Sequence, residues 1–315
     1  MERGARIWIA GGGRFLGGAL ERRLRAAGHE ALLGVGGAAP DLRDAAAVDA
    51  FFAKEKPEYV FLLGGRSGGI ARNQREPADL MLDNLRVEAA VLPAAHRYGV
   101  RKLLYLAAAC IYPRECEQPM GPAQLGSGPL EPTSEAYAMA KWTGLVLCAA
   151  YARQYRLPFF VAIPANAFGP GAETRSEDAH VVEALLCRMH EARMRRDPEV
   201  VVWGSGRAVR DWLYVDDLAD ACVFLMERHT GEEPINVSGG APTSVAELAE
   251  RVRAVVGFEG RLRFDASRPD GAPRKVLDGE PLRRLGWKPR ASFDEALAAT
   301  YAWVRQQAGE ARPDA

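Results

Sequence analysis

Short apolar runs alternate along the first half of the chain with longer segments in which apolar residues recur every three or four positions. The apolar run Arg6–Ala10, for example, is followed by Leu16, Leu20 and Leu24 at helical spacing. Short apolar runs predict strands, and a 3.6-residue period predicts helices. We predict strands at 6–10, 29–33, 59–63, 102–106 and 159–163, and helices at 15–27, 45–54, 77–98 and 135–155. This alternation predicts an α/β fold built on a Rossmann-type, doubly wound parallel sheet.

The pattern becomes less regular beyond about Asn166, where glycine- and proline-rich joints separate short β-like runs from late helices. We predict a dinucleotide-binding Rossmann domain at 1–165, to which a later strand near 234–238 returns. A smaller α+β domain at 166–310 is predicted to cap the carboxyl ends of the strands, where ligands bind in such sheets. The short β-like runs in this second part are at 200–203, 235–237 and 262–264.

Composition and charge exclude several classes of function. Hydrophobic residues make up 48% of the chain and charged residues 26%, as in an ordinary globular enzyme. Lysine plus arginine and aspartate plus glutamate number 41 each, so we expect no nucleic-acid or membrane partner. The five cysteines are irregularly spaced and form no zinc pattern, so no metal site is predicted. Unpaired cysteines favour a reducing, cytoplasmic location.

The turn after the first predicted strand is rich in glycine. Gly11, Gly12, Gly13 and Gly17 flank the sequence Arg14-Phe15-Leu16 at the start of a predicted helix. Glycines allow the backbone to approach a pyrophosphate closely, and the helix N-terminus offers it free N–H groups. A purely structural turn between strand and helix is the alternative. The strand before it and the helix after it favour a dinucleotide site.

Tyr137 and Lys141 form a Tyr-x-x-x-Lys pair in the predicted helix 135–155. Residues four apart lie on one face of a helix, so the phenol and the ammonium project into the same space. A cation beside a phenol lowers its pKa and makes it a better proton donor to a carbonyl oxygen. By itself this spacing occurs by chance on solvated helices. Together with the upstream glycine turn it favours a site that moves a proton to or from a carbonyl oxygen beside a bound dinucleotide.

Further motifs along nearly the whole chain carry a family resemblance. The chain resembles the extended short-chain dehydrogenase/reductases, and within them the GDP-L-fucose synthase family of 3,5-epimerase/4-reductases for GDP-4-keto-6-deoxy-mannose. Besides the Tyr137/Lys141 pair, the motifs are 68–70 (GGI), 110–113 (CIYP), 118–120 (QPM), 130–133 (LEPT), 164–166 (PAN), 169–170 (GP), 180–181 (HV), 201–206 (VVWGSG), 210 (R), 215–217 (VDD) and 269–275 (PDGAPRK).

The resemblance implies an NADP-dependent enzyme, with NAD not excluded by the sequence, and it implies roles for particular residues. Tyr137 would protonate the C4 oxygen of a keto sugar, Lys141 would hold the nicotinamide ribose, Cys110 would be the base of epimerisation and His180 the acid. A free cysteine is otherwise most often a small buried hydrophobe, and a histidine at a helix start is often solvated. The implied cofactor-binding residues are Gly11, Gly13, Arg14, Phe15, Leu16, Gly17, Asp41, Leu42, Lys141, Pro164, Asn166 and His180.

The resemblance also implies a GDP-sugar substrate and a homodimer. Guanidinium and ammonium groups suit the diphosphate of a sugar nucleotide. For Arg188, the alternative to a phosphate-binding role is that of an ordinary solvated arginine on a helix. The dimer would form through the predicted helices 77–98 and 135–155, whose apolar faces are equally suited to a core. The implied substrate-binding residues are Asn166, Arg188, Trp203, Arg210 and Lys275.

Three positions depart from the family pattern. Ala108 stands where the family has a catalytic serine, and no neighbouring hydroxyl can stand in for it, because residues 107 and 109 are also alanine. Arg14 occupies the place of a glycine. The segment 34–37 (GVGG) lacks both the basic residue used for the NADP 2′-phosphate and the acidic residue expected for NAD, although Arg14 is placed to supply a positive charge.

These departures leave three functional hypotheses. The chain is a reductase, with or without epimerisation, in which another group replaces the serine. Alternatively it is a 3- or 5-epimerase that has lost efficient hydride transfer. The third hypothesis is a non-catalytic sugar-nucleotide-binding partner. Retention of Tyr137, Lys141, Cys110 and His180 together favours catalysis.

Overall fold

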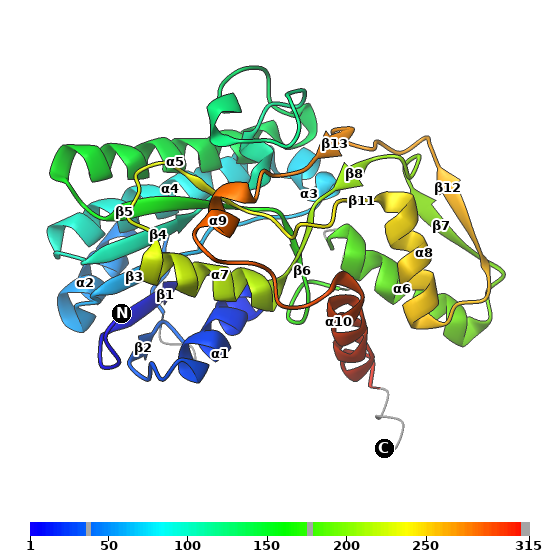
Figure 1. The fold of residues 1–315 in the computed structure, drawn as a ribbon, viewed down its shortest axis with the longest axis horizontal. Coiled ribbons are helices and arrows are strands. Elements are labelled where there is room, and N and C mark those ends of the chain that lie inside the picture. Colours follow the sequence, from blue (N-terminus) through cyan, green and yellow to red (C-terminus); the bar gives the residue numbers. More distant parts are fainter. Residues whose placement is uncertain (36–38, 175–178, 310–315) are drawn as a thin grey trace.

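The computed structural model describes residues 1–35, 39–174 and 179–309 (Figure 1). Its centre is a sheet of six parallel strands in the order β10-β5-β4-β3-β1-β2. The strands are β1 (Ile7–Ala10), β2 (Leu32–Leu33), β3 (Tyr59–Leu62), β4 (Lys102–Leu106), β5 (Phe159–Pro164) and β10 (Ile235–Val237). This confirms the predicted α/β fold. The glycines at 36 and 37 that the sequence analysis singled out lie outside the described residues.

Helices cover both faces of this sheet, which is why the strands are apolar throughout rather than alternating. In Figure 1, α4 and α5 lie along one face, while α1 and α7 lie along the other. The pairs α4–α5 and α1–α7 pack against each other, and α2 packs on α4. The helices are α1 (Gly18–Ala26), α2 (Ala45–Glu55), α4 (Pro77–Arg97), α5 (Glu135–Tyr155) and α7 (Val215–Arg228).

Most predicted boundaries agree with the structure, but two differ. The predicted strand at 29–33 is reduced at its start to Leu32–Leu33, and directly after it the chain turns at Gly34, whose φ of 79° is left-handed. A Cβ at this position would lie 2.7 Å from Trp8 Nε1, so the turn passes directly over the indole. The first predicted helix begins as a π-helical turn, η1 (Gly13–Gly17), before α1.

A second cluster of buried side chains forms the smaller lobe on the right of Figure 1. It lies between α6 (Val181–Arg195), α8 (Val245–Val256), α10 (Phe293–Gln307) and the parallel pair β7 (Glu199–Trp203) and β12 (Arg261–Asp265). The other short elements are α3 (Ile70–Arg75), η2 (Ala109–Ile111), η3 (Pro122–Gln124), η4 (Pro132–Ser134), β6 (Asn166–Phe168), β8 (Val209–Arg210), β9 (Trp212–Tyr214), β11 (Thr243–Ser244), β13 (Arg274–Lys275) and α9 (Glu280–Arg284).

Several late segments pack on the first core and not on the second. The buried side chains of α7 and β10 belong to the cluster around the large sheet. Two acids of α7 hold the chain that follows α9: Asp220 Oδ2 accepts from Trp287 Nε1 at 2.9 Å, and Asp217 Oδ1 accepts from the Arg290 amide at 2.9 Å. β10 pairs with β5, as the returning strand near 234–238 was expected to do. The predicted division at 165/166 stays a prediction.

Glu183 is a completely buried carboxyl in the first turn of α6. One of its oxygens accepts from the Gly169 amide at 3.0 Å, and the other has no hydrogen-bond partner among the described residues. Burial raises the pKa of Glu183 to about 7, and the backbone hydrogen bond opposes that shift only in part. The folded protein therefore holds a proton here that the unfolded chain has released by neutral pH.

This carboxyl makes stability fall as pH rises from about 4.5 to 7, because the unfolded chain binds fewer protons there than the folded one. We predict that Glu183→Gln removes this dependence and raises the free energy of unfolding at pH 8 by up to about 3 kcal/mol. Urea unfolding between pH 4.5 and 8 measures it. Glu191→Gln, at an exposed position of the same helix, serves as the control. Parallel curves for Glu183→Gln and the unsubstituted chain would contradict the prediction.

Candidate active site

The strand order reverses at β1, so its carboxyl end and that of β3 enclose a crevice. The turns after these two strands approach each other closely. Gly11 has a φ of 89°, and a Cβ on it would lie 2.3 Å from Gly64 Cα. One residue on, a Cβ at Gly12 would lie 2.8 Å from the Gly17 amide nitrogen. Glycine is therefore required at these positions by the backbone contacts themselves.

A cavity of about 800 Å³ extends from this turn across the ends of β4 and β5 to the smaller lobe. We call it the central cavity. It brings together side chains that are far apart in the sequence, among them the predicted catalytic residues. Of the predicted site residues, those that line it are Gly13, Phe15, Leu16, Cys110, Tyr137, Lys141, Pro164, Asn166, His180, Arg210 and Lys275.

Other predicted cofactor residues lie around this cavity but do not line it. Gly11 and Gly17 are packed within the turn, and Arg14 is exposed outside the lining. Leu42 packs with its Cδ1 against the backbone of Gly11 and Gly64. The carboxylate of Asp41 is held by Arg43 through two 2.9 Å contacts, and these hold the pKa of Asp41 down to about 2.

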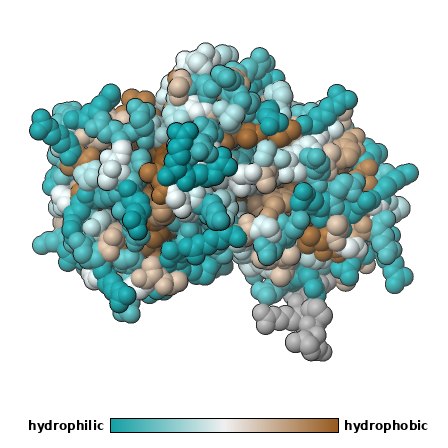
Figure 2. Space-filling view, viewed as in Figure 1, coloured by the Kyte–Doolittle hydropathy of each residue, from teal (hydrophilic) through white to brown (hydrophobic). Residues whose placement is uncertain are grey.

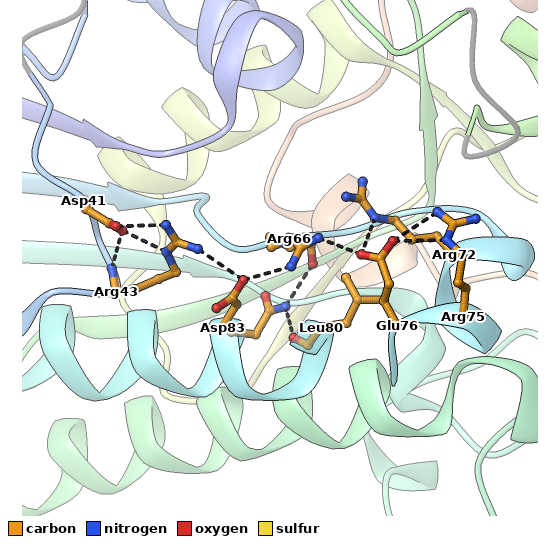
Figure 3. Close-up of polar contacts among 9 residues, drawn as sticks. Asp41, Arg43, Arg66, Arg72, Arg75, Glu76, Leu80 and Asp83 are labelled. Carbon is orange, nitrogen blue, oxygen red and sulfur yellow. Dashed lines mark hydrogen bonds and ion pairs between the residues drawn. The ribbon is translucent and has the colours of Figure 1, made fainter. Parts of the chain in front are cut away.

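Figure 3 shows that Arg43 begins a chain of alternating charges along α4. Its other guanidinium nitrogen lies 3.4 Å from Asp83, which also accepts from Arg66 at 3.1 Å. Arg66 in turn contacts Glu76 at 2.7 Å and lines the central cavity. Sequence reasoning missed this group, because its members are separated by up to 40 residues and share no motif.

Tyr137 and Lys141 project from the first turns of α5, as their spacing predicted. The ammonium of Lys141 is buried, and desolvation lowers its pKa to about 8. Burial also raises the pKa of Tyr137, and the negative charges of Cys110 and Glu88 add to this effect. The expected lowering of the phenol pKa by the lysine is thus outweighed by burial in this structure.

Cys110 and His180 line the same cavity although they lie far apart in the sequence. Burial raises the pKa of the Cys110 thiol, while the ammonium groups of Lys275 and Lys141 act in the opposite direction. His180 is the N-cap residue of α6, and the surrounding protein lowers the pKa of its imidazole by desolvation. Both side chains are consequently favoured in their neutral forms.

Ala108 lines the cavity together with its two alanine neighbours. The adjacent Ala107 and Ala109 offer no hydroxyl, but Thr133 and Ser134, from a different segment, also line this cavity. The Thr133 hydroxyl donates to Glu131 at 3.1 Å, whereas Ser134 is the N-cap residue of the helix that carries Tyr137. Thr133 and Ser134 are far from residue 108 in the sequence, so the residues around position 108 did not point to them.

A second cavity of about 840 Å³, the outer cavity, opens beside the first and shares Asn166, His180 and Arg210 with it. Arg188 and Trp203 line it, as predicted for a substrate site. The Arg188 guanidinium lies 5.5 Å from the centre of the Trp203 ring.

Two groups at the outer cavity were missed by sequence reasoning. Arg268 also lies over the Trp203 ring, at 4.9 Å, and Asp270 contributes a carbonyl that accepts from Arg210 at 3.0 Å. Asp270 lines the outer cavity. Both belong to the segment that includes the motif 269–275, which could have pointed to them.

Two searches of the described ranges gave negative results. No group of three or more His, Cys, Asp or Glu side chains there could hold a metal ion. None of the helices in those ranges is both long and apolar enough to cross a membrane. The space-filling view in Figure 2 shows a mainly hydrophilic face on which hydrophobic residues form small, separate groups.

Comparison with known proteins places this geometry in a family. A model of the NAD dependent epimerase/dehydratase family matches residues 7–238. The chain is 43% identical over 303 residues to putative GDP-L-fucose synthase 2 of Arabidopsis thaliana, covering 96% of this chain and 92% of that one. It is 42% identical over 307 residues to GDP-L-fucose synthase of Escherichia coli K12, covering 95% and 96%.

Solved structures agree with this placement. A GDP-6-OMe-4-keto-L-xylo-heptose reductase from C. jejuni superposes with a TM-score of 0.91 at 28% identity, covering 98% of this chain and 99% of that one. A GDP-L-fucose synthetase from Naegleria fowleri bound to NADP gives a TM-score of 0.88 at 27% identity, covering 99% and 97%. The chain belongs to the NAD dependent epimerase/dehydratase family and, within it, to the GDP-L-fucose synthases.

Proposed function

We propose that this chain is an NADP-dependent enzyme that epimerises and reduces a GDP-linked 4-keto-6-deoxy hexose or a related higher sugar. The observation that carries the proposal is the meeting of Cys110, Tyr137, Lys141 and His180 in one cavity that continues into a second, cation-lined one. A non-catalytic binding partner would have no need for this convergence.

The crevice at the glycine turn fits a dinucleotide cofactor. Gly11 and Gly12 let the turn pack tightly against Gly64 and Gly17, a Cβ on Gly13 would meet no atom within 4 Å, and the N-terminal end of η1 and α1 lies beside the crevice. Gly13, Phe15 and Leu16 would hold the cofactor from this side, while Pro164 and Lys141 would hold its reactive end. Bound NADPH would supply the hydride for reduction.

Tyr137 would donate a proton to the C4 oxygen of the sugar as that carbon is reduced. A raised pKa keeps the phenol protonated at neutral pH, which suits a proton donor. Lys141 would orient the cofactor ribose and supply positive charge beside the phenol as the phenolate forms. Its own pKa of about 8 leaves it mostly charged at neutral pH.

Cys110 and His180 would exchange protons at the carbons next to the ketone. Removal of a proton from C3 or C5 leaves an electron pair that delocalises onto the C4 oxygen, and return of a proton to the opposite face inverts the centre without net redox change. We assign removal to Cys110 and return to His180. Desolvation favours the neutral forms of both side chains. Transfer of one proton from the Cys110 thiol to the His180 imidazole would convert this neutral pair into the thiolate and imidazolium that the reaction needs.

The outer cavity would bind the GDP part of the substrate. Trp203, whose side chain is 46% exposed, would offer an aromatic surface for the base. Arg188 and Arg210 would bind the diphosphate, for which guanidinium groups are well suited. Asn166 lines both cavities and Lys275 lines the central one, where the sugar would lie.

A second function is favoured by one observation. Ala108 removes the serine hydroxyl that would polarise the C4 carbonyl, and epimerisation depends less on cofactor contacts than hydride transfer does. An epimerase with slow hydride transfer is therefore the alternative. Ser134, which lines the same cavity, is the hydroxyl that we propose compensates for Ala108 in the reductase.

We also propose a homodimer formed by α4 and α5. Leu82 on α4 is 47% exposed, and Val146 on α5 is 52% exposed, which leaves apolar side chains on both helices without cover. The five free cysteines fit a reducing compartment, so we propose a cytoplasmic location.

The first prediction concerns the reaction itself. With GDP-4-keto-6-deoxy-mannose in D₂O and NADPH, we expect deuterium at C3 or C5 by NMR and oxidation of NADPH by absorbance. Tyr137→Phe is expected to lower NADPH oxidation by ~10² or more and to retain deuterium exchange, because exchange needs no proton from the phenol. Deuterium exchange without NADPH oxidation in the unsubstituted chain would establish the epimerase instead. The absence of both deuterium exchange and NADPH oxidation would contradict both functions for this substrate.

The second prediction concerns the missing serine. Ala108→Ser is expected to raise the rate of NADPH oxidation by at least tenfold, because an oriented donor to a developing oxyanion contributes ~10²–10³ in rate. Stopped-flow absorbance under single-turnover conditions measures it. Ala109→Ser, in the same lining, is the matched control and should give no gain. If Ser134 compensates for Ala108, Ser134→Ala should slow the unsubstituted enzyme more than the Ala108→Ser variant. Equal slowing would refute that compensation.

The third prediction concerns assembly. Val146→Glu places a charge on the proposed interface and should convert a dimer into a monomer near 34.3 kDa in size-exclusion chromatography with light scattering. Met194→Glu, at a position 62% exposed on α6, should leave the dimer intact. A monomer for the unsubstituted chain at micromolar concentration would rule the dimer out.

A further inference from the structure

Glu88 is a buried carboxyl that points at the reactive face of α5 from beneath. It lies on α4 with 2% of its surface exposed, and its Oε1 is 4.0 Å from the ammonium nitrogen of Lys141. The Tyr105 hydroxyl of β4 donates to the same oxygen at 2.5 Å. The Lys141 nitrogen also lies 4.4 Å from the centre of the Tyr105 ring. Three elements of the Rossmann core thus meet at this point.

The space for this cluster depends on a glycine. Gly144 is three residues after Lys141 on α5, and a Cβ there would lie 2.3 Å from the Tyr105 hydroxyl and 2.4 Å from the Glu88 carboxyl carbon. A glycine inside a helix costs about 0.5–1 kcal/mol relative to alanine. Its presence here leaves room for a carboxylate under the lysine, which an alanine would displace.

The arrangement is not explained by packing alone. The second oxygen of Glu88 has no hydrogen-bond partner among the described residues, and burial raises the pKa of the carboxyl. A buried carboxylate with an unsatisfied oxygen destabilises a core, and an apolar side chain of similar size would serve packing better. The charge of Lys141 is the favourable interaction that remains for it.

We propose that Glu88 is a positioning residue of the active site, whose carboxylate, held by Tyr105 in the space left by Gly144, keeps the Lys141 ammonium charged and aimed at the cofactor ribose. The proposal rests on the proposed function, because it assumes that Lys141 contacts the cofactor. It adds a counter-charge behind the Tyr-x-x-x-Lys pair, on the side away from the substrate.

The electrostatics of the cluster give the direction of the effect. Desolvation lowers the pKa of Lys141, and the charges of Glu88 and then Cys110 raise it. Glu88 faces Lys141 and Tyr137 from α5 and Tyr105 from β4, and its charge raises the pKa of both tyrosines. Loss of the Glu88 charge therefore lowers the pKa of both Lys141 and Tyr137.

The test measures NADPH affinity, by nicotinamide fluorescence, as a function of pH, and it needs no sugar substrate. In the unsubstituted protein, affinity should fall above about pH 8, where Lys141 loses its proton. In Glu88→Gln this fall should begin about one pH unit lower, with binding roughly fivefold weaker at pH 8 and within about twofold at pH 6. Glu88→Asp, which keeps the charge, should restore most of the difference.

Two further variants separate this role from a structural one. Cys148→Ala removes a buried side chain of the same helix and should lower the melting temperature without moving the pH at which affinity falls. Gly144→Ala should displace the carboxylate and shift the fall in the same direction as Glu88→Gln, which supplies an answer if Glu88→Gln does not fold. An unchanged pH dependence in either Glu88→Gln or Gly144→Ala would overturn the proposal. Because NADPH binding is the readout, an error in the proposed sugar leaves this result unaffected.

Discussion

The contact between the turns that follow β1 and β3 is the constraint on which the site depends. Gly11 and Gly64 approach so closely that no side chain fits on the first of them. This contact fixes the crevice at the point where the strand order reverses, and it places the ends of β4 and β5 at a set distance along the same edge. The turns at this edge supply one wall of the central cavity.

The cavity also depends on how the chain divides its second half between two cores. α7 and β10 complete the large sheet, while α6 and α8 form the smaller lobe. His180 and Arg210 belong to segments between these cores and reach the cavity from the smaller lobe's side. Tyr137 and Lys141 of α5 reach it from the other side, so the proposed reaction would take place at the joint between the two.

Sequence patterns predicted the elements of the large sheet well, because apolar runs and helical periods are local properties. The helix 135–155 and the strand 102–106 have the predicted bounds. The cavity residues were located through motifs of the family. Contacts between distant segments were not predictable in this way: Glu88 on α4 reaches Lys141 on α5, and Arg66 is held by Asp83 and Glu76. Ser134 lines the same cavity as Ala108 but comes from a different segment of the sequence.

The alternating charges along α4 make the crevice selective toward the anions that enter it. Arg66, which lines the cavity, is already bound by the carboxylates of Asp83 and Glu76. Any anion that reaches this arginine therefore competes with two carboxylates that already balance its charge. An isolated phosphate ion would gain less here than at an arginine without such neighbours, whereas a ligand held at several other points would depend less on this single contact.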